Sequence, residues 1–487
     1  MTEADVDLHT LQQSVAYALE ALRDQATITE AEVCATWCER YTVRIQYDVE
    51  RPSRGVHTPQ VQTTFGLGML LVIEDQDGRR VGFGSESGDL SLEGIARAFE
   101  QAKAQAVADP YFHGLPVPLV APTISPTFHD PQVLALHEDE MTRLAVEALD
   151  GALSTFKTGG YVHGMRVSGA IRSRKEHMVV GNTHGLLAAE ISTGLLADIT
   201  SHLTQEQCYG TGSSSATHLQ GFAPYDAGEE AAQQALRARG AVTLGAGDFP
   251  VVFSPQAVAD LMQDLLVPAL SLDTVAAGTS PFARRLGQHI SAPLLTVTDD
   301  GRGPGLLGSH GITGEALPTE VTPLIEQGRL VGFLTDVYHA QKLTTRVGAL
   351  SPHNGMRFST RGESFAMRPG IFPTNVRLTG THTVSLAELL APIQDGIYVG
   401  GLWCITPQGG LQTGNFTSTI IGPSFRIRHG TLAAPLRPET LHVHDNVLEL
   451  LHRITGLSSA SRAIPFATMQ SLALAPDIWC SHARFVS

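Results

Sequence analysis

Cysteines and positive charges are both scarce in this sequence, and each shortage excludes a class of protein. The 487 residues include five cysteines, an odd number at irregular spacing, which excludes a disulfide framework and fits a reducing compartment. Lys and Arg total 33 against 48 Asp and Glu, so the formal net charge is −15. A surface this acidic does not attract nucleic-acid phosphates, and we expect no nucleic-acid partner.

The sequence also lacks a long hydrophobic run. Its longest, 65–73, is too short to span a bilayer and is interrupted by Gly66 and Gly68. The first residues, 1–5, are acidic and lack the hydrophobic centre of a signal peptide. We therefore expect a cytoplasmic protein with no membrane partner.

Two of the cysteines, Cys34 and Cys38, lie four residues apart on a predicted helix, 31–40. Two thiols on one helix face can begin a metal site. No second Cys/His pair at zinc spacing accompanies them, so we interpret them as buried thiols.

Glycine and proline, in contrast, are abundant. The 48 Gly and 27 Pro indicate many turns and a strand-rich α+β fold. A hydrophobic content of 43% over this length predicts two or three packed domains. We expect a helix-and-strand N-terminal domain at 1–115, a Pro-rich linker at 116–131, a small α/β middle domain at 132–240 and a large strand-rich C-terminal domain at 248–487.

Local patterns predict individual elements. Apolar residues at helical spacing predict a helix over 8–23, and Ser91 is a predicted N-cap. Two apolar runs, 65–74 and 79–84, flank an Asp-Gly turn and predict a hairpin. A Ser-rich stretch, 210–215, is predicted to be a loop.

The most informative segment is 249–268, which combines a buried strand with a helix. Ser254 is a typical N-cap, and Pro255 occupies the first helical position, where a missing N–H costs nothing. Pro268 is predicted to end or kink the helix. One helix face is apolar, and the other carries Asp260, Gln263 and Asp264.

This segment resembles the TldD/PmbA family, also called modulators of DNA gyrase. Further stretches are similar in order and spacing, namely the hairpin at 65–84 and the segments 278–288, 298–309, 325–340 and 409–416. The resemblance covers nearly the whole chain and implies a C-terminal domain of TldD/PmbA type.

In the zinc-bearing TldD branch, the similar helix carries a His-Glu-x-x-x-His motif, in which the two His bind zinc and the Glu is the general base. The resemblance places these positions on Gln263, Asp264 and Pro268, and a third family ligand, a Cys, near Gly456. Catalytic zinc needs about three protein ligands drawn from His, Cys and carboxylates. Gln is a poor zinc ligand and Pro is none, so we predict no metal and no catalytic residue in this chain.

Three other candidate sites have simpler interpretations. His442 and His444 would share one strand face, but surface histidines beside a helix explain them. Asp299 and Asp300 lie in a Gly- and Pro-rich stretch and are predicted to be turn residues, not an acid–base pair. Cys404 has no His assigned beside it and is predicted to be a buried strand thiol.

The Gly-rich stretch 409–416 is a candidate for peptide binding, because glycine lets another backbone approach and an exposed strand edge can add a peptide strand. The candidate residues are Gly409, Gly410, Thr413, Gly414, Asn415 and Phe416. In the family, unfolded peptides enter a chamber between two subunits, and this stretch resembles segments near that chamber. Asn415 stands where many relatives have Asp. A glycine-rich barrel corner explains the stretch equally well.

The resemblance implies a metal-free, TldE-type subunit that pairs with a zinc-bearing TldD-type subunit to form a peptidase for unfolded peptides or leader peptides. One alternative is a homodimer that binds peptides without cleaving them. A second alternative is an enzyme with non-zinc chemistry that uses Asp264, Asp299 or Cys404.

Overall fold

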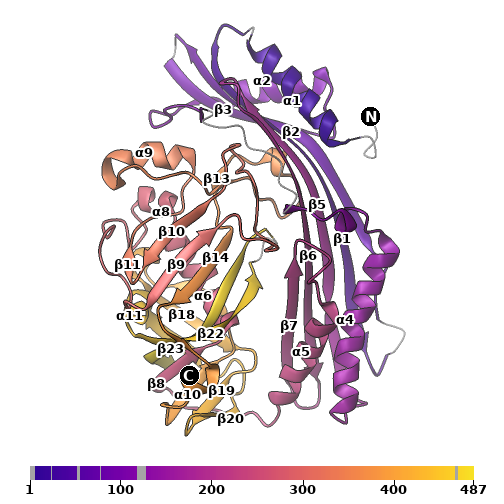
Figure 1. Cartoon of the computed structure of the whole chain (residues 1–487), viewed down its shortest axis with the longest axis vertical. Coiled ribbons are helices and arrows are strands. Elements are labelled where there is room, and N and C mark those ends of the chain that lie inside the picture. The colour runs from indigo at the N-terminus through magenta and orange to yellow at the C-terminus, as the bar shows by residue number, and fades with distance from the viewer. Residues whose placement is uncertain (1–5, 24, 52–54, 77, 118–127, 467–469) are drawn as a thin grey trace.

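The computed structural model describes residues 6–23, 25–51, 55–76, 78–117, 128–466 and 470–487. Two sheets dominate these residues (Figure 1). The first sheet is antiparallel throughout and has the order β4-β3-β2-β1-β5-β6-β7. Its strands are β1 (Ile28–Asp48), β2 (Gln60–Asp75), β3 (Gly78–Ser87), β4 (Val107–Ala108), β5 (Met165–Asn182), β6 (Leu187–Leu203) and β7 (Cys208–Ala216).

The hairpin predicted around residues 75–78 is confirmed, because β2 and β3 pair from Asp75 and Gly78 onward. Two other local predictions are wrong. The predicted helix 31–40 lies inside β1, where Cys34 and Cys38 are buried on one sheet face. The predicted loop 210–215 lies inside β7. In both cases pairing with distant strands overrides the local pattern.

Helices cover the outer face of this sheet at its two ends (Figure 1). At one end, α1 (Leu8–Arg23) and α2 (Leu92–Ala104) pack on Val33 and Ala35 of β1. At the other end, α4 (Glu138–Thr158) and α5 (Pro224–Arg237) pack on Val43 and Ile45 of the same strand. A short helix, α3 (Pro131–Leu134), precedes α4. The prediction of helix 8–23 is confirmed, as is the Ser91 cap, whose Oγ accepts a hydrogen bond from Gly94 N at 3.3 Å.

The segments 1–115 and 132–240, which the sequence predicts to be separate domains, both contribute strands to this sheet, because β1 pairs with β5 along its length. Most of the predicted linker, 116–131, lies outside the described residues. The two segments therefore share one sheet.

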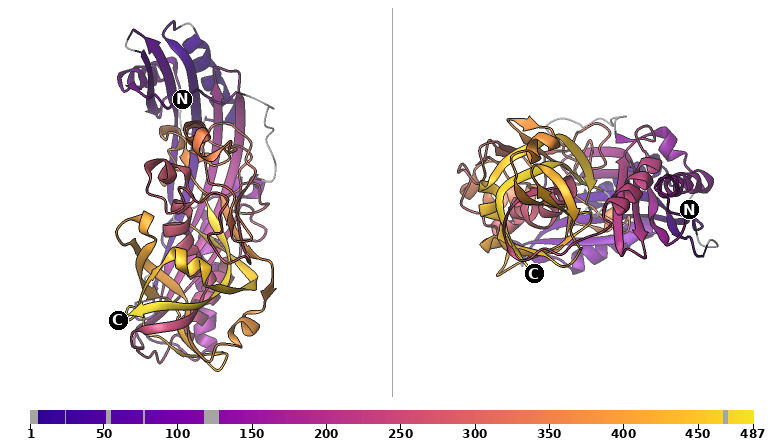
Figure 2. Two further views of the ribbon diagram at one scale, coloured as in Figure 1. Left: turned by 90° about the vertical axis from the view of Figure 1, so that its left-hand side faces the viewer. Right: turned by 90° about the horizontal axis from the view of Figure 1, so that it is seen from below.

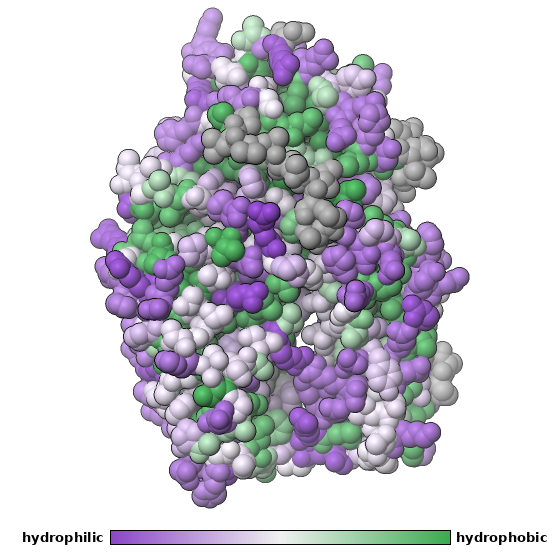
Figure 3. Space-filling view, in the orientation of Figure 1, coloured by the Kyte–Doolittle hydropathy of each residue, from purple (hydrophilic) through white to green (hydrophobic). Residues whose placement is uncertain are grey.

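The inner face of the sheet carries the C-terminal domain, as the views in Figures 1 and 2 show. A Cβ added to Gly68 of β2 would meet the carbonyl oxygen of Phe365 at 1.9 Å, so the two backbones touch there. Farther along the sheet, Leu196 of β6 packs with Leu307 and Leu472. On the face shown in Figure 3, hydrophilic and hydrophobic residues are interspersed.

The C-terminal domain is strand-rich, which confirms the predicted fold class. Its sheet follows the path β11-β10-β9-β14-β23-β8-β16-β19-β20, with β15, β17, β18, β21 and β22 joined at the side. The strands are β8 (Gly247–Phe253), β9 (Leu295–Asp300), β10 (Val321–Glu326), β11 (Arg329–Leu330), β14 (Asn375–Gly380), β15 (Thr383–Val384), β16 (Asp395–Val399), β17 (Gly401–Pro407), β18 (Asn415–Ile421), β19 (Phe425–Arg428), β20 (Thr431–Pro435), β21 (His442–Asn446), β22 (Ile454–Pro465) and β23 (Leu472–Val486). A separate two-stranded sheet joins β12 (Gly355–Met356) to β13 (Gly370–Ile371).

The curved sheet encloses helix α6 (Pro255–Leu261), and the main hydrophobic core lies between them (Figure 1). The other helices of this domain are α7 (Val267–Ala269), α8 (Leu272–Ala277), α9 (Val337–Val347), α10 (Leu386–Leu390) and α11 (Val447–His452). Within the described ranges, no helix is both long enough and apolar enough to cross a bilayer.

Candidate functional site

The candidate site is built on the helix that follows β8, and its start agrees with the sequence prediction. Ser254 Oγ accepts a hydrogen bond from Ala257 N at 3.2 Å, which caps α6, and donates one to Gly400 O at 2.8 Å. Pro255 occupies the first turn. The cap therefore fixes the helix start against the end of β16.

A π-helical turn, Met262–Leu266, follows α6 and contains two of the three predicted site positions, Gln263 and Asp264. Val267 N donates to Met262 O, five residues back. Pro268 has no N–H, and in a regular α-helix its ring would clash with the carbonyl of Asp264. The wider turn relieves that clash, so the helix continues through Pro268 as α7 and ends at Ala269.

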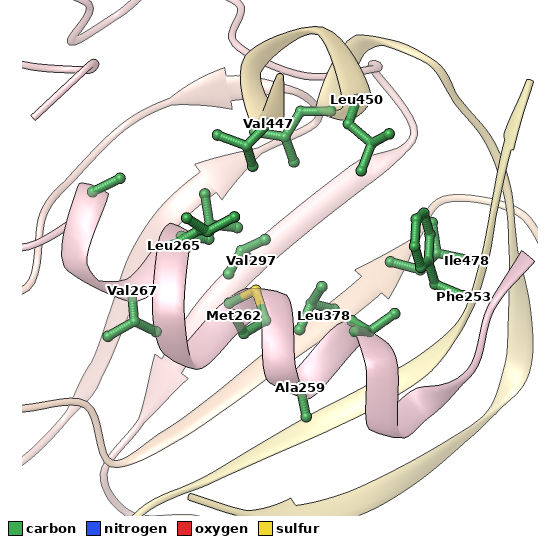
Figure 4. Packing of buried hydrophobic residues seen from close by; sticks show 14 of the residues in the cluster. Phe253, Ala259, Met262, Leu265, Val267, Val297, Leu378, Val447, Leu450 and Ile478 are labelled. Carbon is green, nitrogen blue, oxygen red and sulfur yellow. The ribbon is translucent and has the colours of Figure 1, made fainter. Parts of the chain in front are cut away.

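The apolar side of this helix belongs to the core. Met262 and Leu265 point toward the side on which Val297 and Val447 lie (Figure 4). Both side chains are at most 1% exposed. The π turn is thus held in place by buried packing, and its polar residues lie on the remaining face.

Asp260 is the best-connected polar residue of this face. Its Oδ2 accepts a hydrogen bond from Leu402 N at 2.8 Å, and its Oδ1 accepts one from Gln256 Nε2 at 2.9 Å. Burial raises the pKa of Asp260 to about 6, and the nearby charge of Asp264 adds to the effect. Asp260 therefore ties the helix to strand β17.

The three predicted site positions do not form a zinc site. Gln263 Nε2 donates to Asp264 Oδ1 at 3.1 Å, and Asp264 is exposed. Pro268 offers no side-chain donor atom. Among the described residues, no group of three or more His, Cys, Asp or Glu is arranged to hold a metal. An amide, one carboxylate and a proline do not fit zinc, and no chemical step can be assigned to a metal here.

Strand β17 runs beside this helix and is distorted. Its pairing with β18 shifts register between Trp403 and Thr406, and Cys404 lies in this interruption with φ of +54°. Cys404 is exposed, so the prediction of a buried thiol is wrong. The bulge turns the thiol outward. Trp403 beside it is 63% exposed.

The six predicted peptide-binding residues lie together in one tight turn and the first residues of β18. Gly409, Gly410 and Gly414 have positive φ, which only glycine adopts without strain. Thr413 Oγ1 donates to Gln408 O at 2.7 Å, and Asn415 Oδ1 accepts from Asn446 Nδ2 at 2.8 Å. Phe416 is fully buried in the core. Its side chain is therefore not available to a peptide, whereas Gly409, Gly410 and Asn415 are exposed.

The paired aspartates do not behave alike. Asp299 lies in β9 and is 1% exposed, so the turn interpretation is wrong for this residue. It accepts hydrogen bonds from Thr374 N at 2.8 Å and Asn354 Nδ2 at 2.6 Å, and burial raises its pKa to about 6. Asp300 does cap a turn, because its Oδ1 accepts from Arg302 N at 3.1 Å.

The histidine pair lies on one face of β21, as the strand alternative requires. His442 Nδ1 lies 3.1 Å from Thr419 Oγ1, and His444 is exposed. Asp264, Asp299 and Cys404 are placed in three different settings: an exposed helix face, the core and a strand bulge. They do not form a nucleophile with its base.

Sequence reasoning missed a buried charged cluster between the first sheet and the C-terminal domain. It contains Glu32, Glu315, Asp336 and Arg357, each at most 6% exposed. These residues are far apart in the sequence and belong to no motif. An isolated charged residue in an apolar strand pattern, such as Glu32, is the only available signal.

Comparison with known proteins places this geometry in context. Residues 246–486 match the family model described as the PmbA/TldA metallopeptidase C-terminal domain. A metalloprotease of Synechocystis is 28% identical over 233 residues, which are 47% of this chain and 46% of that protein. A metalloprotease TldD homolog of Haemophilus influenzae is 27% identical over 314 residues, 61% of each chain. The chain thus spans about half to three fifths of the length of these curated relatives.

Solved structures match over almost the whole chain. The fold is similar to that of TldE from Thermococcus kodakarensis, with a TM-score of 0.80 and 21% identity over 98% of this chain and 100% of that one. A Thermotoga maritima protein, described as a candidate modulator of a DNA gyrase, gives a TM-score of 0.76 with 18% identity over 98% and 99% of the two chains. These likenesses establish the fold.

Proposed function

Because this chain belongs to the PmbA/TldD family of metallopeptidase-like proteins, we propose that it is the metal-free subunit of a two-subunit peptidase whose partner carries the zinc. The observation that carries this proposal is the donor set on the site helix. By the family resemblance, Gln263, Asp264 and Pro268 occupy the positions at which a zinc peptidase of this family has its His, Glu and His. Peptide hydrolysis by the pair then requires the partner's residues.

The role proposed for this chain is to hold an extended, unfolded peptide or leader peptide. Strand β17 pairs with β18 on one side, and its bulge places the indole of Trp403 at the surface. An extended peptide can add to such a strand edge through main-chain hydrogen bonds, with an aromatic side chain as the anchor. The exposed backbone at Gly409 and Gly410 lies at the end of the same hairpin.

Metal content and peptidase activity test the pairing. Three samples are compared: this chain alone, a zinc-bearing TldD-type partner alone, and the two co-expressed. We expect the chain alone to hold no stoichiometric zinc and to leave an unfolded peptide intact, and the pair to form a complex that cleaves it. One firmly bound zinc in the chain alone, or chelator-sensitive hydrolysis by it, contradicts the proposal.

Peptide binding is tested on the same complex with Trp403→Ala. We expect this variant to weaken peptide binding about tenfold, because truncating a central aromatic anchor typically costs more than 1 kcal/mol. Val384→Ala, another exposed hydrophobic residue on β15, is the matched control and should leave binding unchanged. If the two variants bind the peptide with equal affinity, β17 is not part of the peptide site.

A homodimer that binds peptides without cleaving them is the second candidate, and the exposed Trp403 beside a strand edge supports it equally. The molecular mass of the chain alone and with a zinc-bearing partner separates the two. A stable homodimer that forms no complex with the zinc-bearing partner favours the second candidate.

A further inference from the structure

A cavity of about 340 Å³ lies where the first sheet meets the C-terminal domain. Apolar side chains from both parts line it: Leu70, Val81, Phe112, Leu115, Val337 and Ile371. The Phe112 ring stacks on Tyr338 with 6.4 Å between centroids. None of the described lining residues belongs to α6 or to the turn at 409–416, so the cavity is separate from the site described above.

Three buried carboxylates also line this cavity. Glu32 comes from near the start of β1, Glu315 from the loop after β9, and Asp336 caps α9. Their residues are 2%, 6% and 3% exposed, respectively. Glu315 accepts a hydrogen bond from Val337 N at 3.2 Å, shared between its two oxygens.

Two of these carboxylates each have one oxygen that accepts no hydrogen bond from the described residues. Glu32 Oε1 accepts from Arg357 Nη2, and Asp336 Oδ1 accepts from His339 N at 2.8 Å. Over the described part of the chain, Glu32 Oε2 and Asp336 Oδ2 accept no hydrogen bond. Each of these oxygens can therefore accept a hydrogen bond from a ligand that enters the cavity.

Acidic residues outnumber basic residues in the described lining, which also contains Asp109 and Asp273 but only Arg368 and His339 as bases. His339 Nδ1 lies 2.8 Å from Asp336 Oδ1. Arg357 is committed to Glu32, and its Nε donates to Gly314 O at 2.8 Å. Lys342 sits over the ring of Tyr111, 4.6 Å from its centroid. Burial raises the pKa of Glu315 well above its usual value, and the charges of Asp336 and Glu32 add to this. The raised pKa favours the neutral form of Glu315, and a cation that enters the cavity would favour its charged form again.

We propose that this cavity binds an organic cation, an ammonium or guanidinium group on a short apolar chain. The cationic group donates hydrogen bonds to Glu32 Oε2 and Asp336 Oδ2, and the chain lies against Phe112 and Leu115. Lysine and arginine side chains, peptide amino termini and free amines share this chemistry. Arg368 also lines the cavity, and it limits the site to a ligand of modest charge.

Calorimetric titration of the full chain tests the proposal. The probes are butylammonium, butylguanidinium, uncharged butanol and anionic butyrate. We expect one site that takes at least one of the two cations, with butanol and butyrate at least about tenfold weaker, a difference of about 1.4 kcal/mol. The comparison of the two cations separates an ammonium site from a guanidinium site. Saturable binding of neither cation up to about 10 mM, or equal binding of butanol, overturns the proposal.

Asp336→Asn is the matching variant, since Asn is also a good N-cap and keeps an oxygen for His339 N while the charge is lost. We expect it to weaken binding of the cation at least about tenfold. Glu326→Gln removes the same charge from the exposed end of β10 and serves as the control. Unchanged cation affinity in Asp336→Asn contradicts the assignment. The outcome does not depend on a partner subunit, so it is distinguishable from the peptidase test.

Discussion

At the scale of single residues, the helix cap was predictable and the buried acids were not. Ser254 accepts a hydrogen bond from a backbone N–H three residues away, so its role can be predicted from the local sequence. Asp299 is held by Asn354 and Thr374, which lie 55 and 75 residues later. No local pattern identifies such partners, which is why a turn was expected there. The same holds for Cys404, whose exposure depends on the register of β17 against β18.

The raised pKa of Asp260 makes folding stability depend on pH. Its usual pKa is 3.8 and its folded value is about 6, so the folded state binds more protons between these values. Stability contributed by this group is therefore present below about pH 4 and is lost as the pH rises to about 6. Asp260→Asn keeps an acceptor for Leu402 N and removes the titration. We expect the variant to be more stable than the parent above pH 6, by about 1–3 kcal/mol.

Urea unfolding from about pH 4 to about pH 7 measures this difference. Asp150→Asn on the exposed face of α4 is the control and should follow the parent at every pH. A parent and an Asp260→Asn variant with parallel profiles would show that Asp260 titrates normally.

At the scale of elements, the sequence predicted the helix over 8–23, the helix after Ser254 and the β2–β3 hairpin, but misassigned 31–40 and 210–215. The local composition of these two segments does not show that they lie within long strands. β1 is buried on both faces, because helices pack on one side and the C-terminal domain on the other, so it lacks the alternation of a half-exposed strand. The π turn was also not predicted, since it is a response to Pro268 within a packed core.

Two serines at helix starts allow a matched test of capping. Ser254 caps α6 and also donates to Gly400 O, whereas Ser271 precedes α8 and its Oγ makes no cap bond. We expect Ser254→Ala to lower the free energy of unfolding by about 1–2 kcal/mol. Ser271→Ala should cost nothing, because its buried Oγ has no hydrogen-bond partner to lose among the described residues. Denaturant titrations of both variants decide this, and equal losses would refute the capping argument.

At the scale of the whole molecule, a buried ion pair joins the two halves, which are the first sheet with its helices and the C-terminal domain. The sequence does not predict this contact. Glu32 of β1 pairs with Arg357, and both side chains are at most 2% exposed. Burying this pair costs solvation, so it adds little net stability, but removal of one member leaves a charge without its partner.

We therefore expect Arg357→Ala to destabilise the protein by about 3–5 kcal/mol. Arg462→Ala breaks the more exposed ion pair with Glu230 across the same two halves and should cost about 0–1 kcal/mol. Equilibrium unfolding followed by far-UV circular dichroism measures both. If the two variants lose the same stability, the buried pair is not what holds the halves in register.

The position of β1 between β2 and β5 also sets an order of events during synthesis. On the ribosome, β1 can form a hairpin with β2 early, but its other edge has no partner until residues 166–182 have emerged. A chain released after residue 115 would carry a long open strand edge, a template for aggregation. The second sheet waits longer still, because β8 at its centre pairs with β16 and β23, and β23 emerges last.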